Sequence, residues 1–267
     1  MSSLPSLLVT AILLASIAYI FSGNSANNTP MAGVAPLASL TVPAATKHTA
    51  TIIFVHGIGE SASTWKPVAE KLRNDLPQVK WVLPNAPLTP FSGAGGMPIP
   101  CWFDIPAFGN QSRQDREGML KTVYSLNKLI TEEVDAGIPA ERIVLGGFSQ
   151  GAIMTLLTGL TGERKLGGML VLSGFMPLRP DVKSMLSEHV KSQRIFMGHG
   201  ALDRMVSYDW AVESVKWLRE EVGLNTSPGD DLVGLSFNSY QGVQHTVSDQ
   251  EFVDFKEWLK KALPSID

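Results

Sequence analysis

Cysteine is almost absent from this chain, and its scarcity excludes two kinds of site. Cys101 is the single cysteine among 267 residues, so no internal disulfide can form. No group of cysteine and histidine residues has the spacing of a metal site, and no cofactor motif is present in the sequence. We therefore expect neither a metal nor a cofactor, and we interpret Cys101 as a small packed residue.

An excess of positive charge is also lacking. The formal net charge is −3 at pH 7 and the isoelectric point is near 6.0, so nothing electrostatic favours a nucleic-acid backbone. The hydrophobic content of 44% at this length is typical of one globular domain with a sizeable core. No nucleic-acid partner is expected.

The first 46 residues contain no Lys, Arg, Asp or Glu. Leu4 to Phe21 is an almost unbroken apolar stretch of 18 residues, which is the threshold length for a membrane span. A secretory signal is the alternative, but the basic region that normally opens such signals is missing. Because Ser22 to Pro30 has the small, polar composition of a linker, we predict an N-terminal anchor with its linker at 1–30 and a folded domain at 31–267.

Strand and helix patterns alternate from residue 51 onward, with a long irregular stretch expected at 84–110. Alternating βα units predict an α/β fold with a mostly parallel sheet and helices on both faces. Ligands of such sheets bind at the carboxyl ends of the strands. The expected strands cover 51–55, 79–83, 142–147, 166–172, 193–197 and 235–240, and the expected helices cover 64–74, 112–135, 152–157, 211–222 and 249–262.

The pentapeptide Gly147-Phe148-Ser149-Gln150-Gly151 lies between an expected strand and an expected helix. A strand, a sharp turn and a helix form the geometry that presents a serine hydroxyl as a nucleophile. Small residues flank Ser149 because a strained turn leaves no room for a Cβ there. A serine at a glycine-rich strand end is the alternative, but the flanking strand and helix favour a nucleophile.

A serine nucleophile needs a base, usually a histidine that a carboxylate holds in place. His245 follows the last expected strand, which is the usual place for the base when the order is Ser, Asp, His. His56 and His199 each precede a glycine at a strand end and are interpreted as loop or packing residues. Asp203, in the loop after the 193–197 strand, is the best-placed acid. Its competitors are Asp181, Asp209, Asp230 and Asp231.

The oxyanion that forms during acyl transfer needs two preorganised donors. Gln150, the residue after the nucleophile, should supply one backbone N–H. Ile58 should supply the other, because Gly57 and Gly59 allow the loop after the first strand to bend toward the serine. An ordinary strand-exit turn is the alternative interpretation of this loop.

These motifs together resemble the acyl-protein thioesterase/lysophospholipase group of α/β-hydrolases, from about Met31 to the C-terminus. The resemblance implies triad roles for Ser149, Asp203 and His245 and oxyanion roles for Ile58 and Gln150. Departures are Ala152, Ala201, Arg204 and Cys101, which leave the triad intact but alter nearby positions. The motifs are Phe54–Glu60 (FVHGIGE), Trp65, Pro84–Pro87 (PNAP), Trp102–Ile105 (WFDI), Gly146–Gly151 (GGFSQG), Leu172–Phe175 (LSGF), His199-Gly200 with Asp203, and His245.

The resemblance implies a serine hydrolase that removes thioester-linked palmitoyl groups from S-acylated proteins, with lysophospholipids as further substrates. A carboxylesterase acting on oxygen esters and a non-catalytic binding protein are the alternatives. The resemblance also implies a cytoplasmic enzyme, with the nucleus as a second location and Met31 as an alternative start. If translation begins at Met1, membrane contact through Leu4 to Phe21 is expected instead.

The stretch from Leu88 to Ile105 combines apolar side chains with turn-forming glycines. Long irregular loops often serve as lids or binding loops. An acyl chain covered by such a loop gains about 0.8 kcal/mol per buried methylene. Capping of the core is the alternative role, and the resemblance favours substrate binding by Leu88, Met97, Trp102 and Phe103.

Overall fold

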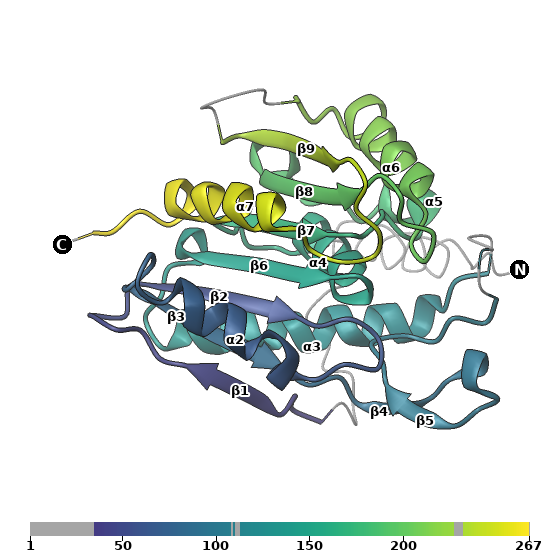
Figure 1. The fold of residues 1–267 in the computed structure, drawn as a ribbon, viewed down its shortest axis with the longest axis horizontal. Coiled ribbons are helices and arrows are strands. Elements are labelled where there is room, and N and C mark those ends of the chain that lie inside the picture. The colour runs from purple at the N-terminus through teal and green to yellow at the C-terminus, as the bar shows by residue number, and fades with distance from the viewer. Residues whose placement is uncertain (1–34, 108, 110–112, 227–231, 267) are drawn as a thin grey trace, which may run out of the picture. The chain divides into compact units, whose positions relative to one another are not determined.

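The computed structural model describes residues 35–107, 109, 113–226 and 232–266 (Figure 1). The predicted boundary near residue 30 and the apolar Leu4–Phe21 segment lie outside these residues. None of the helices in the described ranges is long and apolar enough to span a membrane.

A seven-stranded sheet in the order β1-β3-β2-β6-β7-β8-β9 forms the centre of the domain (Figure 1). Only β1 runs antiparallel, paired with β3; every other neighbouring pair is parallel. The strands are β1 (Ser39–Val42), β2 (Ala50–Val55), β3 (Val79–Pro84), β6 (Ile143–Phe148), β7 (Gly168–Leu172), β8 (Arg194–Gly200) and β9 (Gly234–Tyr240).

Helices cover both faces of the sheet, and each face has its own apolar cluster. The helices α3 (Arg116–Asp135), α4 (Gln150–Thr161) and α6 (Tyr208–Glu220) contribute to one cluster. The helices α2 (Ala62–Leu72) and α7 (Asp249–Ala262) contribute to the other. Because side chains alternate along a strand, Ile53 joins the first cluster and Ile52 the second, which explains why the central strands are apolar throughout. The remaining short helices are α5 (Arg179–Val182), η1 (Ser92–Ala94), η2 (Ala140–Arg142) and η3 (Val190–Ser192).

The predicted α/β class, with a mostly parallel sheet between two helical layers, is confirmed. The C-terminal helix has the predicted bounds, Asp249–Ala262, and begins where the Ser248 hydroxyl accepts the N–H of Glu251 at 3.1 Å. The edge strand β1 was not predicted. Its backbone is ordered by its pairing with β3, a contact between segments some 40 residues apart that local pattern does not reveal.

The stretch expected to be irregular contains a short hairpin, which corrects that expectation. Strands β4 (Leu88–Pro90) and β5 (Pro98–Pro100) pair antiparallel, and η1 lies in their connection. Gly95 and Gly96 close the turn with φ of 65° and 86°, a region that favours glycine. The prolines at the ends of these strands concealed the pairing, since proline weakens a strand prediction.

Candidate active site

Ser149 lies at the end of β6, immediately before α4. Its backbone has φ 55° and ψ −119°, a combination that non-glycine residues rarely adopt. A Cβ at Gly147 would overlap the backbone of Gly151, and a Cβ at Gly151 would overlap the backbone oxygen of Val55. Both glycines are therefore required by close backbone approach, as the sequence pattern predicted.

Three side chains from distant parts of the chain meet at this turn. The Ser149 Oγ is 3.0 Å from the His245 Nε2, and the His245 Nδ1 is 2.6 Å from the Asp203 Oδ2. An ionised carboxylate only accepts hydrogen bonds, so the Nδ1 carries the proton and the Nε2 lone pair faces the serine hydroxyl. The arrangement can withdraw a proton from Ser149.

Asp203 is 4% exposed as a residue, and both of its carboxylate oxygens have donors. Its Oδ1 accepts the backbone N–H groups of Met205 and Val206 at 2.9 and 3.0 Å, and the His199 Nε2 is 3.4 Å from its Oδ2. Burial by itself raises the pKa of Asp203, but the contacts with His199, His245 and Val206 outweigh burial and hold that pKa below its usual value. Asp203 therefore stays ionised opposite His245.

Neither of the competing acids that the structure describes, Asp181 and Asp209, is bonded to His245. Asp181 pairs with Arg116 on the surface, with 2.8 Å between the guanidinium Nε and the carboxylate Oδ2. Asp209 lies in the exposed first turn of α6, while Asp230 and Asp231 lie outside the described residues. His56 and His199 bond to loops, as expected: the His56 Nδ1 is 2.7 Å from the Gly57 oxygen and the His199 Nε2 is 2.9 Å from the Val206 oxygen.

Ile58 and Gln150 line the same pocket as Ser149. Gln150 is the first residue of α4, so its N–H has no acceptor within the helix. Among the hydrogen bonds of the described residues, the N–H of Ile58 has no acceptor, whereas those of Gly57 and Gly59 are paired. These two N–H groups lack an acceptor in the described part of the chain and line the pocket of Ser149, which is what an oxyanion formed beside that serine would require.

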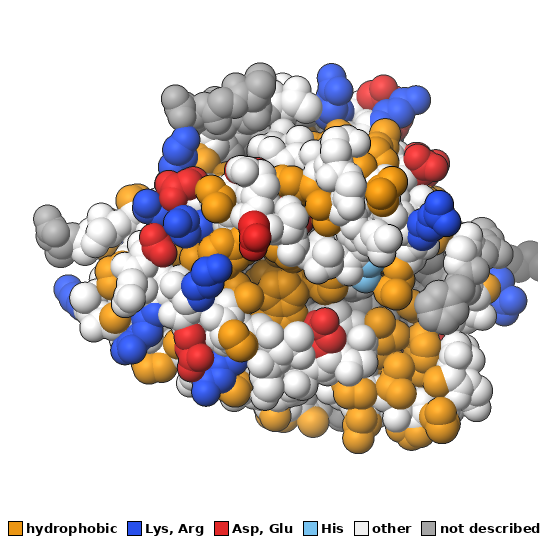
Figure 2. Space-filling view, in the orientation of Figure 1, with side chains coloured by type: hydrophobic (Ala, Val, Ile, Leu, Met, Phe, Trp, Pro, Cys, Tyr) orange, Lys and Arg blue, Asp and Glu red, His pale blue; other side chains and the backbone are white. Residues whose placement is uncertain are grey.

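The pocket beside Ser149 is mainly apolar. Among the predicted substrate-binding residues, Phe103 lines it, whereas Trp102 is 2% exposed and is not one of the residues that line it. Leu88 and Met97 lie on the hairpin, 71% and 64% exposed, where hydrophobic side chains gather on the surface (Figure 2). The other apolar lining residues are Ile58, Ile105, Ala107, Met119, Ile153, Phe175, Met205, Val206 and Trp210.

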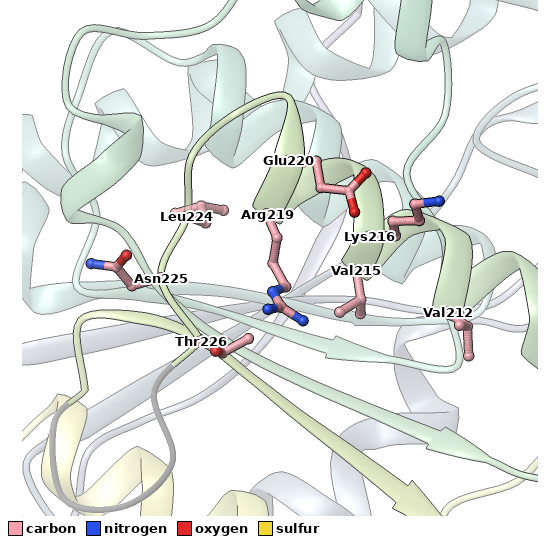
Figure 3. Close-up of a pocket in the computed structure, with 8 residues that line it drawn as sticks. All are labelled: Val212, Val215, Lys216, Arg219, Glu220, Leu224, Asn225 and Thr226. Carbon is pink, nitrogen blue, oxygen red and sulfur yellow. The ribbon is translucent and has the colours of Figure 1, made fainter.

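A larger hollow of about 460 Å³ lies elsewhere, between α6 and the segment that follows it (Figure 3). Its lining includes Lys216, Arg219 and Glu220 but no serine, histidine or cysteine. Volume alone therefore does not identify the reactive site. Within the described ranges, no group of three or more His, Cys, Asp or Glu side chains could hold a metal ion.

Two supporting contacts were not predicted from the sequence. The Glu60 Oε2 accepts the N–H of Gly57 at 2.9 Å and the indole N–H of Trp65 at 3.0 Å, and thereby holds the loop that carries Ile58. His199 supports Asp203 in a similar way. The spacing of His199 four residues before Asp203 was the only available signal, because such contacts depend on loop geometry.

Curated relatives match most of the chain. The acyl-protein thioesterase 1 of Cryptococcus neoformans is 45% identical over 222 residues, covering 81% of this chain and 93% of that protein. The acyl-protein thioesterase 1 of Yarrowia lipolytica is 36% identical, covering 85% of this chain and 97% of that protein.

Solved structures and a family model lead to the same group. The crystal structure of Zea mays acyl-protein thioesterase 2 has a TM-score of 0.73 at 26% identity, covering 85% of this chain and 99% of that chain. The phospholipase/carboxylesterase family model matches residues 38–263. The family model covers most of the chain, and Ser149 lies in a sharp turn between a strand of a mostly parallel sheet and a helix. The chain therefore belongs to the phospholipase/carboxylesterase family of α/β-hydrolases.

Proposed function

We propose that this protein is a thioesterase that removes long-chain fatty acyl groups, palmitoyl among them, from S-acylated proteins. The observation that carries the proposal is the Ser149 Oγ, 3.0 Å from the His245 Nε2 at the wall of an apolar pocket. The relatives named acyl-protein thioesterase support the thioester as the scissile bond.

In the first half of the reaction, the Ser149 Oγ attacks the thioester carbonyl carbon while the His245 Nε2 takes the hydroxyl proton. The carbonyl oxygen becomes an oxyanion that accepts the N–H groups of Ile58 and Gln150. The carbon–sulfur bond then breaks, and the thiol leaves with the proton from His245. An acyl ester on Ser149 remains.

In the second half, water replaces the thiol. His245 accepts a proton from the water as its oxygen attacks the acyl ester, and the same two N–H groups hold the second oxyanion. Collapse returns the proton to Ser149 and releases the fatty acid. Asp203 stabilises the protonated imidazole in both halves through the 2.6 Å contact with the His245 Nδ1.

Substrate contacts divide between the pocket and the hairpin. Phe103 contacts the acyl chain near Ser149, where burial of each methylene contributes about 0.8 kcal/mol. Leu88 and Met97 contact the lipidated substrate outside the pocket, on the exposed hairpin. Trp102 does not line the pocket, so no acyl-chain contact is assigned to it.

Hydrolysis of oxygen esters, including lysophospholipids, is the second candidate, because the family model describes phospholipases and carboxylesterases. The same triad and oxyanion donors serve either bond. A non-catalytic binding role is disfavoured, since such a protein has no need of a serine, an imidazole and a carboxylate in hydrogen-bonded sequence.

The test compares turnover of a palmitoyl thioester, an acetyl thioester and a short oxygen ester by the full chain and by its Ser149→Ala variant. We expect kcat/KM to rise with acyl length below the micelle threshold and to vanish in the variant. Labelling by a fluorophosphonate should place the adduct on Ser149. A chain-length series that is flat or falling would favour a general carboxylesterase, and an adduct on Ser173 would overturn the nucleophile.

Location forms a separate proposal. A cytoplasmic enzyme starting at Met31 would lack Leu4–Phe21, whereas translation from Met1 would anchor the protein in a membrane. Fractionation of both tagged forms distinguishes them, because only the longer form should pellet after alkaline carbonate extraction. Asn110 and Asn225 each begin an Asn-x-Ser sequon, and glycosylation at either would place the domain on the lumenal side.

A further inference from the structure

The two candidate oxyanion donors come from separate segments, the loop after β2 and the start of α4. Catalysis requires their N–H groups to converge on one oxygen, and small displacements weaken that convergence. We propose that Trp102 is a positioning residue that ties these two donors together, rather than a residue that touches the acyl chain. The proposal rests on the proposed hydrolase function and assigns this side chain its part in it.

The first link joins Trp102 to the loop that carries Ile58. The Trp102 indole N–H donates to the His56 backbone oxygen at 2.8 Å. The His56 ring is itself held, because its Nε2 accepts the N–H of Ala86 at 3.1 Å and its Nδ1 bonds the Gly57 oxygen. Burial lowers the pKa of His56, which keeps its ring neutral and able to accept that N–H.

The second link joins the same residue to Gln150. The Gln150 Oε1 accepts the Trp102 backbone N–H at 2.8 Å, and the Gln150 Nε2 donates to the Phe103 oxygen at 2.7 Å. Gln150 therefore supplies an oxyanion N–H from its backbone and holds Trp102 with its side chain. The Thr122 hydroxyl donates to the Trp102 backbone oxygen, so every polar group of Trp102 is bonded.

Contacts from Glu60 and Pro100 also hold the loop that carries Ile58, and they leave the Ile58 N–H to bind a ligand. Glu60 accepts the N–H of Gly57, and the Pro100 oxygen accepts that of Gly59 at 2.8 Å. The N–H groups of Gly57 and Gly59 are both bonded, and Trp102 holds the preceding residue through the His56 oxygen. Together these contacts fix the direction of the Ile58 N–H. A buried polar network of this kind rigidifies a site when all its members are bonded.

The experiment replaces Trp102 with phenylalanine, which retains an aromatic ring and removes the indole N–H. Trp81→Phe is the matched control, because Trp81 is also buried and its indole N–H has no partner among the described residues. Both variants lose a similar volume, but only Trp102→Phe breaks a hydrogen bond to the oxyanion loop.

On whichever ester or thioester the wild type hydrolyses, Trp102→Phe should lower kcat by about 10- to 100-fold with KM changed less than about threefold, since loss of a whole donor costs about 10²- to 10³-fold. Inhibition by a long-chain trifluoromethyl ketone, which forms the oxyanion on the serine, should weaken by a similar factor. Trp81→Phe should retain wild-type kcat and inhibition. An unchanged kcat would overturn the positioning role. If KM rises while kcat is unchanged, Trp102 is a substrate contact instead.

If Trp102→Phe does not fold, Gln150→Met makes the same test from the other end. It retains the Gln150 backbone N–H and removes the side-chain link to Trp102, so kcat and ketone inhibition should fall together. Wild-type kcat in Gln150→Met would contradict the proposal. If the wild-type protein itself hydrolyses neither thioesters nor esters, the proposed function is contradicted. The failure of the proposed function is therefore distinguishable from the failure of the positioning role.

Discussion

Asp203 and Glu251 are both buried carboxylates, 4% and 0% exposed, yet their surroundings lead to opposite charge states. Asp203, in the loop after β8, accepts two backbone N–H groups and faces two imidazoles. Neither oxygen of Glu251, in the first turn of α7, accepts a hydrogen bond of good geometry within the described ranges.

Their pKa values differ accordingly. Donors hold the pKa of Asp203 below its usual value despite burial. Burial raises the pKa of Glu251 to about 8, with Asp254 adding to the rise and the Ser248 backbone opposing it. Burial therefore does not decide the charge of a carboxylate; the donors arranged around it do.

The strongest way to break this comparison is Asp203→Asn. The two backbone N–H groups should hold the amide oxygen, so the NH₂ group would face His245 and force the proton onto the Nε2. That tautomer cannot accept the Ser149 proton, and kcat should fall by about four orders of magnitude. Steady-state kinetics checks this, with Asp181→Asn as the control that keeps wild-type turnover. Near-normal turnover in Asp203→Asn would mean that another acid serves His245.

Glu251→Gln tests the other carboxylate of this comparison, whose pKa is raised by burial. Because the folded-state pKa of about 8 lies above the usual 4.5, the contribution of the neutral carboxyl is fully present below about pH 4.5. It is lost as the pH rises through 8, by up to roughly 5 kcal/mol. Urea unfolding at pH 5, 7 and 9 should show the wild type losing stability relative to Glu251→Gln. Parallel curves for the two proteins would show that Glu251 titrates normally.

Replacement of His199 tests whether one side-chain donor matters to Asp203. His199→Leu removes the Nε2 contacts with Asp203 and Val206, and kcat should fall about 10-fold, near 1.4 kcal/mol. His199→Gln can donate from a similar position and should recover most of the activity. Equal losses in both variants would indicate a packing role for the ring instead.

The smallest effect is expected at the N-cap of α7. Ser248→Ala removes the hydroxyl that accepts the N–H of Glu251 and should lower the free energy of unfolding by about 1 kcal/mol, with kcat unchanged. Ser248→Asp retains an acceptor and is the matched control in thermal unfolding. An Ala variant as stable as the Asp variant would show that this cap contributes little.

Much of the fold followed from local pattern. The central strands are apolar on both faces and the helices carry one apolar stripe, so β2, β6 and α7 were predicted close to their observed bounds. The sharp turn at Ser149 was also predictable from the sequence, since only small residues fit beside Ser149. Those features depend on neighbours within a few positions of the chain.

Features that depend on distant partners were decided by the tertiary structure. The pairing of β1 with β3 joins segments far apart in sequence, and so does the bond from the Trp102 indole to His56. Apolar composition together with the family resemblance placed Trp102 with the substrate-binding residues, because a sequence does not show which polar group a side chain will meet. Residue types therefore determined the fold class and nominated the reactive residues, whereas packing between elements determined the charge states and the aim of the donors.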